Sequence, residues 1–214
     1  MSKRTIIGRS GSRNARAYHH GHLKEKLLEA AERLLERDGV AGLSLRAVAR
    51  AAGVSHAAPY RHFRDKNGLL SALAVTGFDR LSIEMDRARA RHASDPAAGL
   101  IAAGRAYVRL AVASPALTTL MFGGMPPDAV CENCQQAGDR AFGTLISIVE
   151  NGRRAGIYRK TDSQTLSVAA WSAMHGLATL FSSQSLAEAT RSRRASDELA
   201  SAVGELMLHG MLKR

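Results

Sequence analysis

The sequence predicts an all-α protein, with a small N-terminal three-helix domain followed by a larger helical domain. Apolar residues recur at three- and four-residue spacing through most of the chain, which is the period of helices and not of strands. Two helix starts are marked by a capping side chain before a proline, at Asp95-Pro96 and at Ser114-Pro115. The sequence shows neither the clear apolar–polar alternation of a strand nor an Asn-Gly pair between two apolar runs, so it gives no sign of a β-hairpin.

The N-terminal domain is expected over residues 18–66, after a flexible arm formed by residues 1–17. The arm holds five basic residues and no acid, and it lacks any apolar period. A first helix is predicted over residues 23–38, where Gly39 ends it in the left-handed conformation that glycine tolerates. Ser44 is expected to cap a second, short helix.

The C-terminal domain is expected over residues 67–214, and it begins within a fourth helix that starts near Asp65. Its later helices are bounded by capping side chains and by glycines. Two of these helices start at Pro96 and Pro115, and the three that follow are expected at residues 128–155, 162–183 and 196–211.

Positive charge is concentrated in the first third of the chain. Residues 1–70 hold fourteen Lys or Arg against six Asp or Glu, whereas residues 71–214 hold sixteen against thirteen. Such a field at one end of a chain is typical of proteins that bind a polyanion. The basic surface of an ordinary soluble protein would give the same composition.

The lack of a recognisable targeting signal and the small number of cysteines predict a cytoplasmic protein. No apolar run is long enough to cross a bilayer, and no apolar stretch follows the basic N-terminus as it would in a secretory signal. The two cysteines, Cys131 and Cys134, are too few for a disulfide scaffold. We therefore expect no membrane attachment and a reducing compartment.

The stretch after the first helix has the plan of a helix-turn-helix motif, in which two short helices are joined by a glycine turn. Ala49 is small where the two helices would cross, and Gly53 can adopt a positive φ in the turn. Val54 and Phe63 supply apolar contacts, and Ser55 is expected to cap the third helix.

The sequence LSLRAVARAAGVSHAAPYRHFRDKNGLLSALA, residues 43–74, closely resembles the DNA-binding segment of TetR-family transcriptional regulators, above all in its YRHF…K ending. The first helix, which ends in LLERDG, fits the same family. Further on, WSAMHG, residues 171–176, resembles the Trp-His-Gly (WHG) element in the C-terminal domain of one subgroup. The resemblance implies a DNA-binding transcriptional regulator, most often a repressor, and not an enzyme.

The resemblance also implies that the third helix is a recognition helix, which lies in a major groove of double-stranded DNA. Arg46 matches a position that contacts a base, while Ser44 and Lys66 match phosphate contacts, and Tyr60 would point at the DNA backbone. An arginine fork fits guanine edges, and lysine suits phosphate oxygens. The full set of implied DNA-binding residues is Ser44, Arg46, Ser55, His56, Ala57, Ala58, Tyr60, Arg61, His62 and Lys66.

Pro59 departs from the family's pattern, which has a branched apolar residue at this position. In a helix capped by Ser55, Pro59 would remove one early hydrogen bond but have little preceding helix to clash with. We expect a slightly distorted recognition helix rather than a broken one. The base contacts themselves stay open.

The family resemblance further implies a homodimer that binds a palindromic operator and is released by a small-molecule effector. The dimer interface would use residues 167–181 and 199–211, with buried area from Leu206 and Met207. Small residues would let these helices approach closely: Ala169, Ala170, Ala173, Gly176, Ala200 and Gly204. An apolar effector pocket is expected, although such side chains also form ordinary core. Its candidate residues are Tyr107, Met121, Phe122, Met125, Trp171, Met174 and His175.

Other clusters give little indication of chemistry. His19, His20 and His22 precede the first helix without converging on one ion, and Cys131 and Cys134 lack the second pair of ligands that structural zinc needs. A redox role for the two thiols stays open. No phosphate loop, nucleophile elbow or His-Glu-x-x-His motif is present. We therefore expect no metal site, no cofactor and no catalysis.

A second interpretation is an architectural or partner-binding protein that uses DNA only as a platform and has no small-molecule effector. One or a few palindromic binding sites would indicate a regulator, and many scattered sites an architectural role. The sequence leaves open the effector, the operator sequence, the regulated genes and the sign of regulation.

Overall fold

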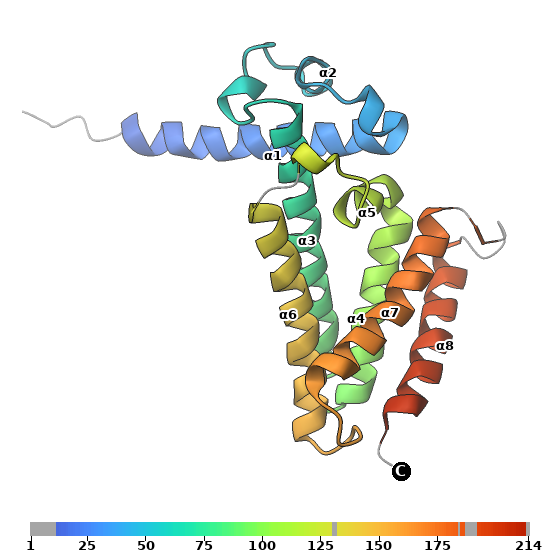
Figure 1. Cartoon of the computed structure of the whole chain (residues 1–214). Helices are drawn as coiled ribbons and strands as arrows, with labels where there is room; N and C mark the ends of the chain where they lie inside the picture. The colour runs from blue at the N-terminus through green and yellow to red at the C-terminus, as the bar shows by residue number, and fades with distance from the viewer. Residues whose placement is uncertain (1–11, 130–131, 184, 187–191, 213–214) are drawn as a thin grey trace, which may run out of the picture. The chain divides into compact units, whose positions relative to one another are not determined.

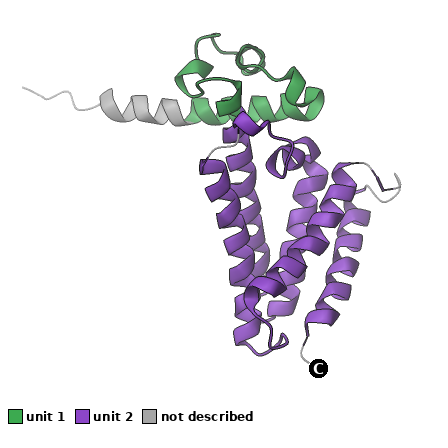
Figure 2. Ribbon diagram, viewed as in Figure 1, with its two compact units in different colours: residues 1–69 green, residues 70–214 purple. Residues whose placement is uncertain are grey.

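The computed structural model describes residues 12–129, 132–183, 185–186 and 192–212, with side chains from residue 22 onward. These residues form eight α-helices and two 3-10 helices, and their only β feature is an isolated bridge between Tyr158 and Leu212 (Figure 1). The predicted all-α class is therefore confirmed. Figure 2 shows the two compact units into which the chain divides, residues 1–69 and 70–214.

Unit 1 contains α1 (Ser12–Gly42), α2 (Leu45–Ala51) and the 3-10 helix η1 (Pro59–Arg61). Helix α1 packs against α2, and α2 packs against η1. Gly39 has a φ of 66° inside α1, so the regular first helix stops at the glycine where the sequence predicted its end. Ser44 caps α2 as expected, since its Oγ accepts a hydrogen bond from Ala47 N at 3.1 Å.

Apolar side chains from all these segments form the core of unit 1. Each of the following is no more than 3% exposed: Leu27, Leu35, Leu43, Val48, Ala49 and Phe63. Burial of one large aliphatic or aromatic side chain stabilises a fold by roughly 1.5–3 kcal/mol. The apolar face of α1 thus packs against α2, as its sequence period indicates.

The third helix of the predicted helix-turn-helix motif is not α-helical. Residues 55–62 form turns and the single 3-10 helix η1, and neither Ser55 nor any other side chain caps it. Proline is the physical reason, because Pro59 has no N–H to donate to the carbonyl four residues earlier. The Pro59 carbonyl instead accepts hydrogen bonds from His62 N and Phe63 N, both at 2.9 Å. The expectation of a slightly distorted but continuous helix is wrong.

Unit 2 is a helical bundle in which α4 packs against α5, α6, α7 and α8. Its helices are α3 (Lys66–Ala90), whose first turn belongs to unit 1, α4 (Pro96–Ala113), α5 (Pro115–Met121), η2 (Pro127–Ala129), α6 (Glu132–Arg154), α7 (Ser163–Ser182) and α8 (Arg193–Met211). Asp95 caps α4 and Asp162 caps α7 through backbone N–H groups, as the sequence indicated. Ser114 precedes α5 without a side-chain capping bond.

Three predicted boundaries are shifted. Residues 1–11 of the expected arm lie outside the described part of the chain, and residues 12–17 belong to α1. Helix α6 is described from Glu132, and η2 contains residues 128 and 129, with which the predicted helix began. Helix α8 begins early because Ser192 caps it, whereas Ser196, where the helix was predicted to start, is buried and donates its hydroxyl to Arg193 O at 2.9 Å.

No single helix of the described residues is long and apolar enough to cross a membrane. Helices α4 and α5 reach that length and apolarity only when taken together, and they are bent by 111° at the break between them. Ser114 at this break is buried, as are most of the residues that follow it in α5.

Candidate functional site

Polar side chains of unit 1 are exposed along the segment between α2 and α3. Of the residues expected to face DNA there, Ser55, His56, Ala57, Tyr60 and Arg61 are exposed, whereas Ala58 and His62 are partly buried. Pro59 and Phe63 are buried and anchor the segment. The structure thus presents a short, firmly held turn with an outward polar face.

The turn that leads into this segment is fixed by backbone geometry. Gly53 has a φ of 65°, which an L side chain rarely adopts. Gly53 N donates to Arg50 O at 3.1 Å, and Val54 N donates to Ala49 O at 3.0 Å. These bonds end α2 and set the direction in which the polar turn leaves it.

Three cationic side chains of this surface form no ion pair with any carboxylate in the described residues. They are Arg46 on α2, Arg61 in η1 and Lys66 at the start of α3. By contrast, Arg37 pairs with its neighbour Asp38. The charge of these three side chains is therefore not neutralised by any carboxylate that the structure describes, and it is available to a polyanion.

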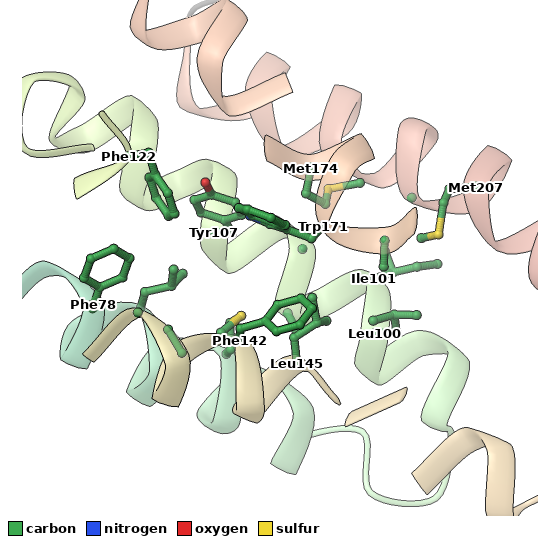
Figure 3. Close-up of a pocket in the computed structure, with 18 of the residues that line it drawn as sticks. Phe78, Leu100, Ile101, Tyr107, Phe122, Phe142, Leu145, Trp171, Met174 and Met207 are labelled. Carbon is green, nitrogen blue, oxygen red and sulfur yellow. The ribbon is translucent and has the colours of Figure 1, made fainter. Parts of the chain in front are cut away.

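A cavity of about 310 Å³ lies within unit 2 (Figure 3). Its wall comes from α3, α4, α6, α7 and α8, together with Phe122 after α5. This volume is at the lower end of the roughly 300–1,000 Å³ that is usual for ligand pockets. The lining is apolar except for two ionisable side chains, Tyr107 and Asp139.

The structure brings four of the seven expected pocket residues to the cavity wall, and these are Tyr107, Phe122, Trp171 and Met174. The other three lie elsewhere. Met121 is buried against Gly77 of α3, Met125 lies between α5 and η2, and His175 sits behind Tyr107.

Sequence reasoning missed much of the wall, including Phe78, Leu100, Ile101, Phe142 and Met207, which Figure 3 labels. On α6, the lining residues follow helical spacing, with Gly138, Ala141, Phe142 and Leu145 on one face. That period identifies the buried face of a helix. It does not tell which buried faces leave a space between them.

A polar pair joins the cavity wall to the residue behind it, because Tyr107 lines the cavity and His175 does not. The Tyr107 hydroxyl and His175 Nδ1 share a hydrogen bond of 2.6 Å, and the Phe122 ring meets His175 edge-on at 4.8 Å. Burial raises the pKa of the Tyr107 phenol above its ordinary value and lowers the pKa of His175. Both groups are therefore neutral near pH 7, and the pair fixes the geometry of the wall without adding charge.

The metal and thiol candidates are not assembled into a site in the described residues. No group of three or more His, Cys, Asp or Glu side chains there could hold an ion. The side chains of His19 and His20, and the whole of Cys131, lie outside the described residues. Cys134 is buried, and its Sγ donates to Ser71 O at 3.6 Å.

The chain resembles known proteins in both sequence and fold. An HTH-type transcriptional regulator of Mycobacterium tuberculosis is 34% identical over 143 residues, which cover 65% of this chain and 61% of that relative. The match thus spans less than two thirds of the relative's length. A Rhodococcus protein of unknown function is 39% identical, with a TM-score of 0.78 over 92% of this chain and 98% of its own.

The TetR family regulator PfmR of Thermus thermophilus is 24% identical, with a TM-score of 0.67 over 89% of this chain and 97% of its own, a likeness that shows the fold alone. Residues 27–73 match the family of bacterial regulatory proteins of the tetR type, and residues 100–203 match a tetracyclin repressor-like C-terminal domain. The chain therefore belongs to the TetR family of helix-turn-helix transcriptional regulators, a non-enzymatic family.

Proposed function

We propose that this protein is a repressor that binds a palindromic operator in double-stranded DNA as a homodimer and is released by a small-molecule effector. The observation that carries the proposal is the surface of unit 1, where Arg46, Arg61 and Lys66 have no carboxylate partner among the described residues. In a TetR-family regulator, such a surface fits the phosphates and base edges of a duplex.

In this proposal, residues 18–66 bind DNA, and residues 67–214 bind the effector and a second copy of the chain. Arg61 and His56 are assigned to base edges, and Tyr60 to the DNA backbone. Because η1 is a single 3-10 turn of three residues, few side chains project from it along one regular helical face. We therefore expect few base contacts from η1, and a correspondingly large share from Arg46 on α2.

Exposed apolar side chains on α7 and α8 support the dimer. Val168 is 42% exposed, Leu180 is 43% exposed and Leu206 is 75% exposed. Ala170, Ala200 and Gly204, which the sequence suggested for close approach between subunits, are instead buried within unit 2. Of the small residues named, Ala169 and Gly176 are exposed and remain available for the interface.

The same two helices support coupling between effector and DNA. Helices α7 and α8 line the cavity through Trp171, Met174 and Met207, and the same two helices carry the exposed apolar residues Val168, Leu180 and Leu206. A ligand that shifts either helix would change the pairing of two subunits and the distance between their DNA-binding surfaces. Two such surfaces must be about 34 Å apart to reach successive major grooves. A coupling of about 1–3 kcal/mol would weaken DNA binding by one to two decades.

The assignment of Trp171, His175 and Gly176 to the Trp-His-Gly subgroup stays a proposal. The Trp171 and His175 rings lie 5.3 Å apart between their centroids, and Trp171 lines the cavity. This arrangement is consistent with a shared role of the element in shaping the effector pocket.

The DNA surface is tested by fluorescence anisotropy with a duplex selected from random sequences. Arg46→Ala is expected to weaken specific binding by about 1–3 kcal/mol. Lys66→Ala is expected to lower the slope of log K against log salt by about one. Arg33→Ala removes an exposed charge from α1 and serves as the control. Equal effects of all three variants, or no DNA binding by the wild type, would overturn the assignment.

A further inference from the structure

None of the described residues that line the cavity of unit 2 carries a positive charge. Two arginines that adjoin lining residues in the sequence are paired with carboxylates, since Arg140 pairs with Asp79 at 2.9 Å and Arg105 pairs with Asp197 at 3.6 Å. An anionic ligand group inside this wall would lose its hydration without gaining a cationic partner. The lining therefore disfavours carboxylates and phosphates.

The entrance of the cavity is marked by Asp139 and Trp171, which are the exposed members of the lining. Asp139 forms no ion pair with any cation in the described residues. It lies on α6 three residues before Phe142, so both side chains belong to neighbouring faces of one helix. The Phe142 and Trp171 rings are 5.8 Å apart between centroids and tilted by 58°.

An unpaired carboxylate in the same lining as a pair of aromatic rings, and one helical turn from one of them, is the chemistry that recognises an organic cation. The carboxylate supplies the opposite charge, and the ring faces attract the cation through their quadrupoles. The deeper wall, with Leu100, Ile101, Met174 and Met207, suits an apolar body (Figure 3). A small amphiphilic molecule would place its charged end at the entrance and its apolar end inside.

We infer that the cavity binds a lipophilic organic cation, whose ammonium group is held by Asp139 at the edge of the aromatic pair formed by Phe142 and Trp171. As the effector of the regulator, this ligand class rests on the proposed function. Binding itself can be measured without DNA, because Trp171 is the chain's only tryptophan and reports directly on the entrance.

The test uses three probes of equal length: 4-phenylbutylamine, 4-phenylbutan-1-ol and 4-phenylbutanoate. Each is titrated into the full chain at pH 7 while Trp171 fluorescence and the heat of binding are recorded. The amine is expected to bind about tenfold more tightly than the alcohol, which corresponds to one ion pair and one cation–π contact. The carboxylate is expected to bind more weakly than the alcohol.

Two variants make the test specific to Asp139. Asp139→Asn should reduce the advantage of the amine over the alcohol to about twofold or less, and leave the affinity for the alcohol unchanged. Glu132→Gln, which removes an exposed acid from the same helix outside the lining, should keep the wild-type ratio. Circular dichroism melting checks that both variants fold.

Preferential binding of the carboxylate, equal binding of all three probes, or binding of none would overturn the inference, as would an unchanged ratio in Asp139→Asn. DNA binding by the ligand-free protein is measured in parallel. If DNA binds but the amine does not, the ligand class is wrong and the regulator stands. If the amine binds but no duplex does, the proposed function is wrong and the cavity's preference stands.

Discussion

Leu206 offers the sharpest test of the proposed subunit interface. It is a large aliphatic side chain on α8, and three quarters of its surface, 75%, is exposed in the single chain. An exposed side chain of this kind contributes little burial free energy in the monomer, and we expect the partner subunit to cover it. Leu206→Ala should therefore weaken the dimer while leaving the stability of the monomer almost unchanged.

The magnitude follows from the carbon atoms removed. Leu206→Ala deletes three carbons, each worth about 0.8 kcal/mol when fully buried. Because 75% of the side chain is available to be covered by a partner, the loss is about 1.8 kcal/mol per subunit. A twofold interface uses the residue twice, so the dimer loses roughly 3.5 kcal/mol. That is between two and three decades in the dissociation constant.

Sedimentation equilibrium over a range of protein concentrations measures this constant directly. Ile83→Ala is the matched control, since Ile83 is an aliphatic residue on α3 that is 49% exposed but lies outside α7 and α8. The control should leave the dissociation constant within about threefold of the wild type, a difference of roughly 0.65 kcal/mol. An unchanged constant in Leu206→Ala, or an equal loss in Ile83→Ala, would refute the assignment of the interface.

Three further predictions concern backbone conformation, a buried hydrogen bond and the pH dependence of stability. Gly53→Ala should lower the free energy of unfolding in urea by about 1 kcal/mol, because Gly53 has a positive φ. Gly143→Ala should raise it by about 0.5–1 kcal/mol, because alanine is the better helix former and a Cβ at Gly143 in α6 meets no other atom. Effects of equal sign would contradict this. Tyr107→Phe should cost about 1 kcal/mol and lower Tm by about 2–4 °C, because it removes the hydroxyl bonded to His175; an unchanged Tm would argue against that bond. Burial lowers the folded-state pKa of His175, so the unfolded chain binds more protons just below pH 6.5, the ordinary histidine value, and stability falls as the pH drops through that window. His175→Asn should remove part of this loss, and identical pH profiles for variant and wild type would count against it.

Local signals in the sequence predicted much of the fold. Asp95 and Asp162 cap their helices as expected, and Gly39 ends the regular first helix with a positive φ. Such features depend on a few neighbouring residues, so they can be read from short stretches. The third helix could not be predicted in the same way. Its form depends on how Pro59, buried and without an N–H, competes with the helical tendency of the residues around it.

The candidate site was harder to predict because it joins residues far apart in the sequence. Tyr107 and Trp171 were indicated by their type, and both line the cavity. Phe78 and Phe142 line it as well, although nothing in their local sequence separates them from ordinary core residues. Met121 has a suitable side chain but packs against Gly77 instead. Helical periodicity gives the inward face of each helix, and the space left between five such faces depends on their packing.

The central claim is that two copies of the chain read a palindromic duplex through the surface of α2, η1 and the start of α3. The most direct measurement selects bound sequences from random duplexes and compares their affinity with that of scrambled duplexes at moderate salt. The account predicts one family of palindromic sites, bound with a dissociation constant on the order of 10⁻⁸ M or lower and at least 10³-fold more tightly than scrambled DNA. Recovery of many unrelated sequences with equal affinity, or of none, would contradict it.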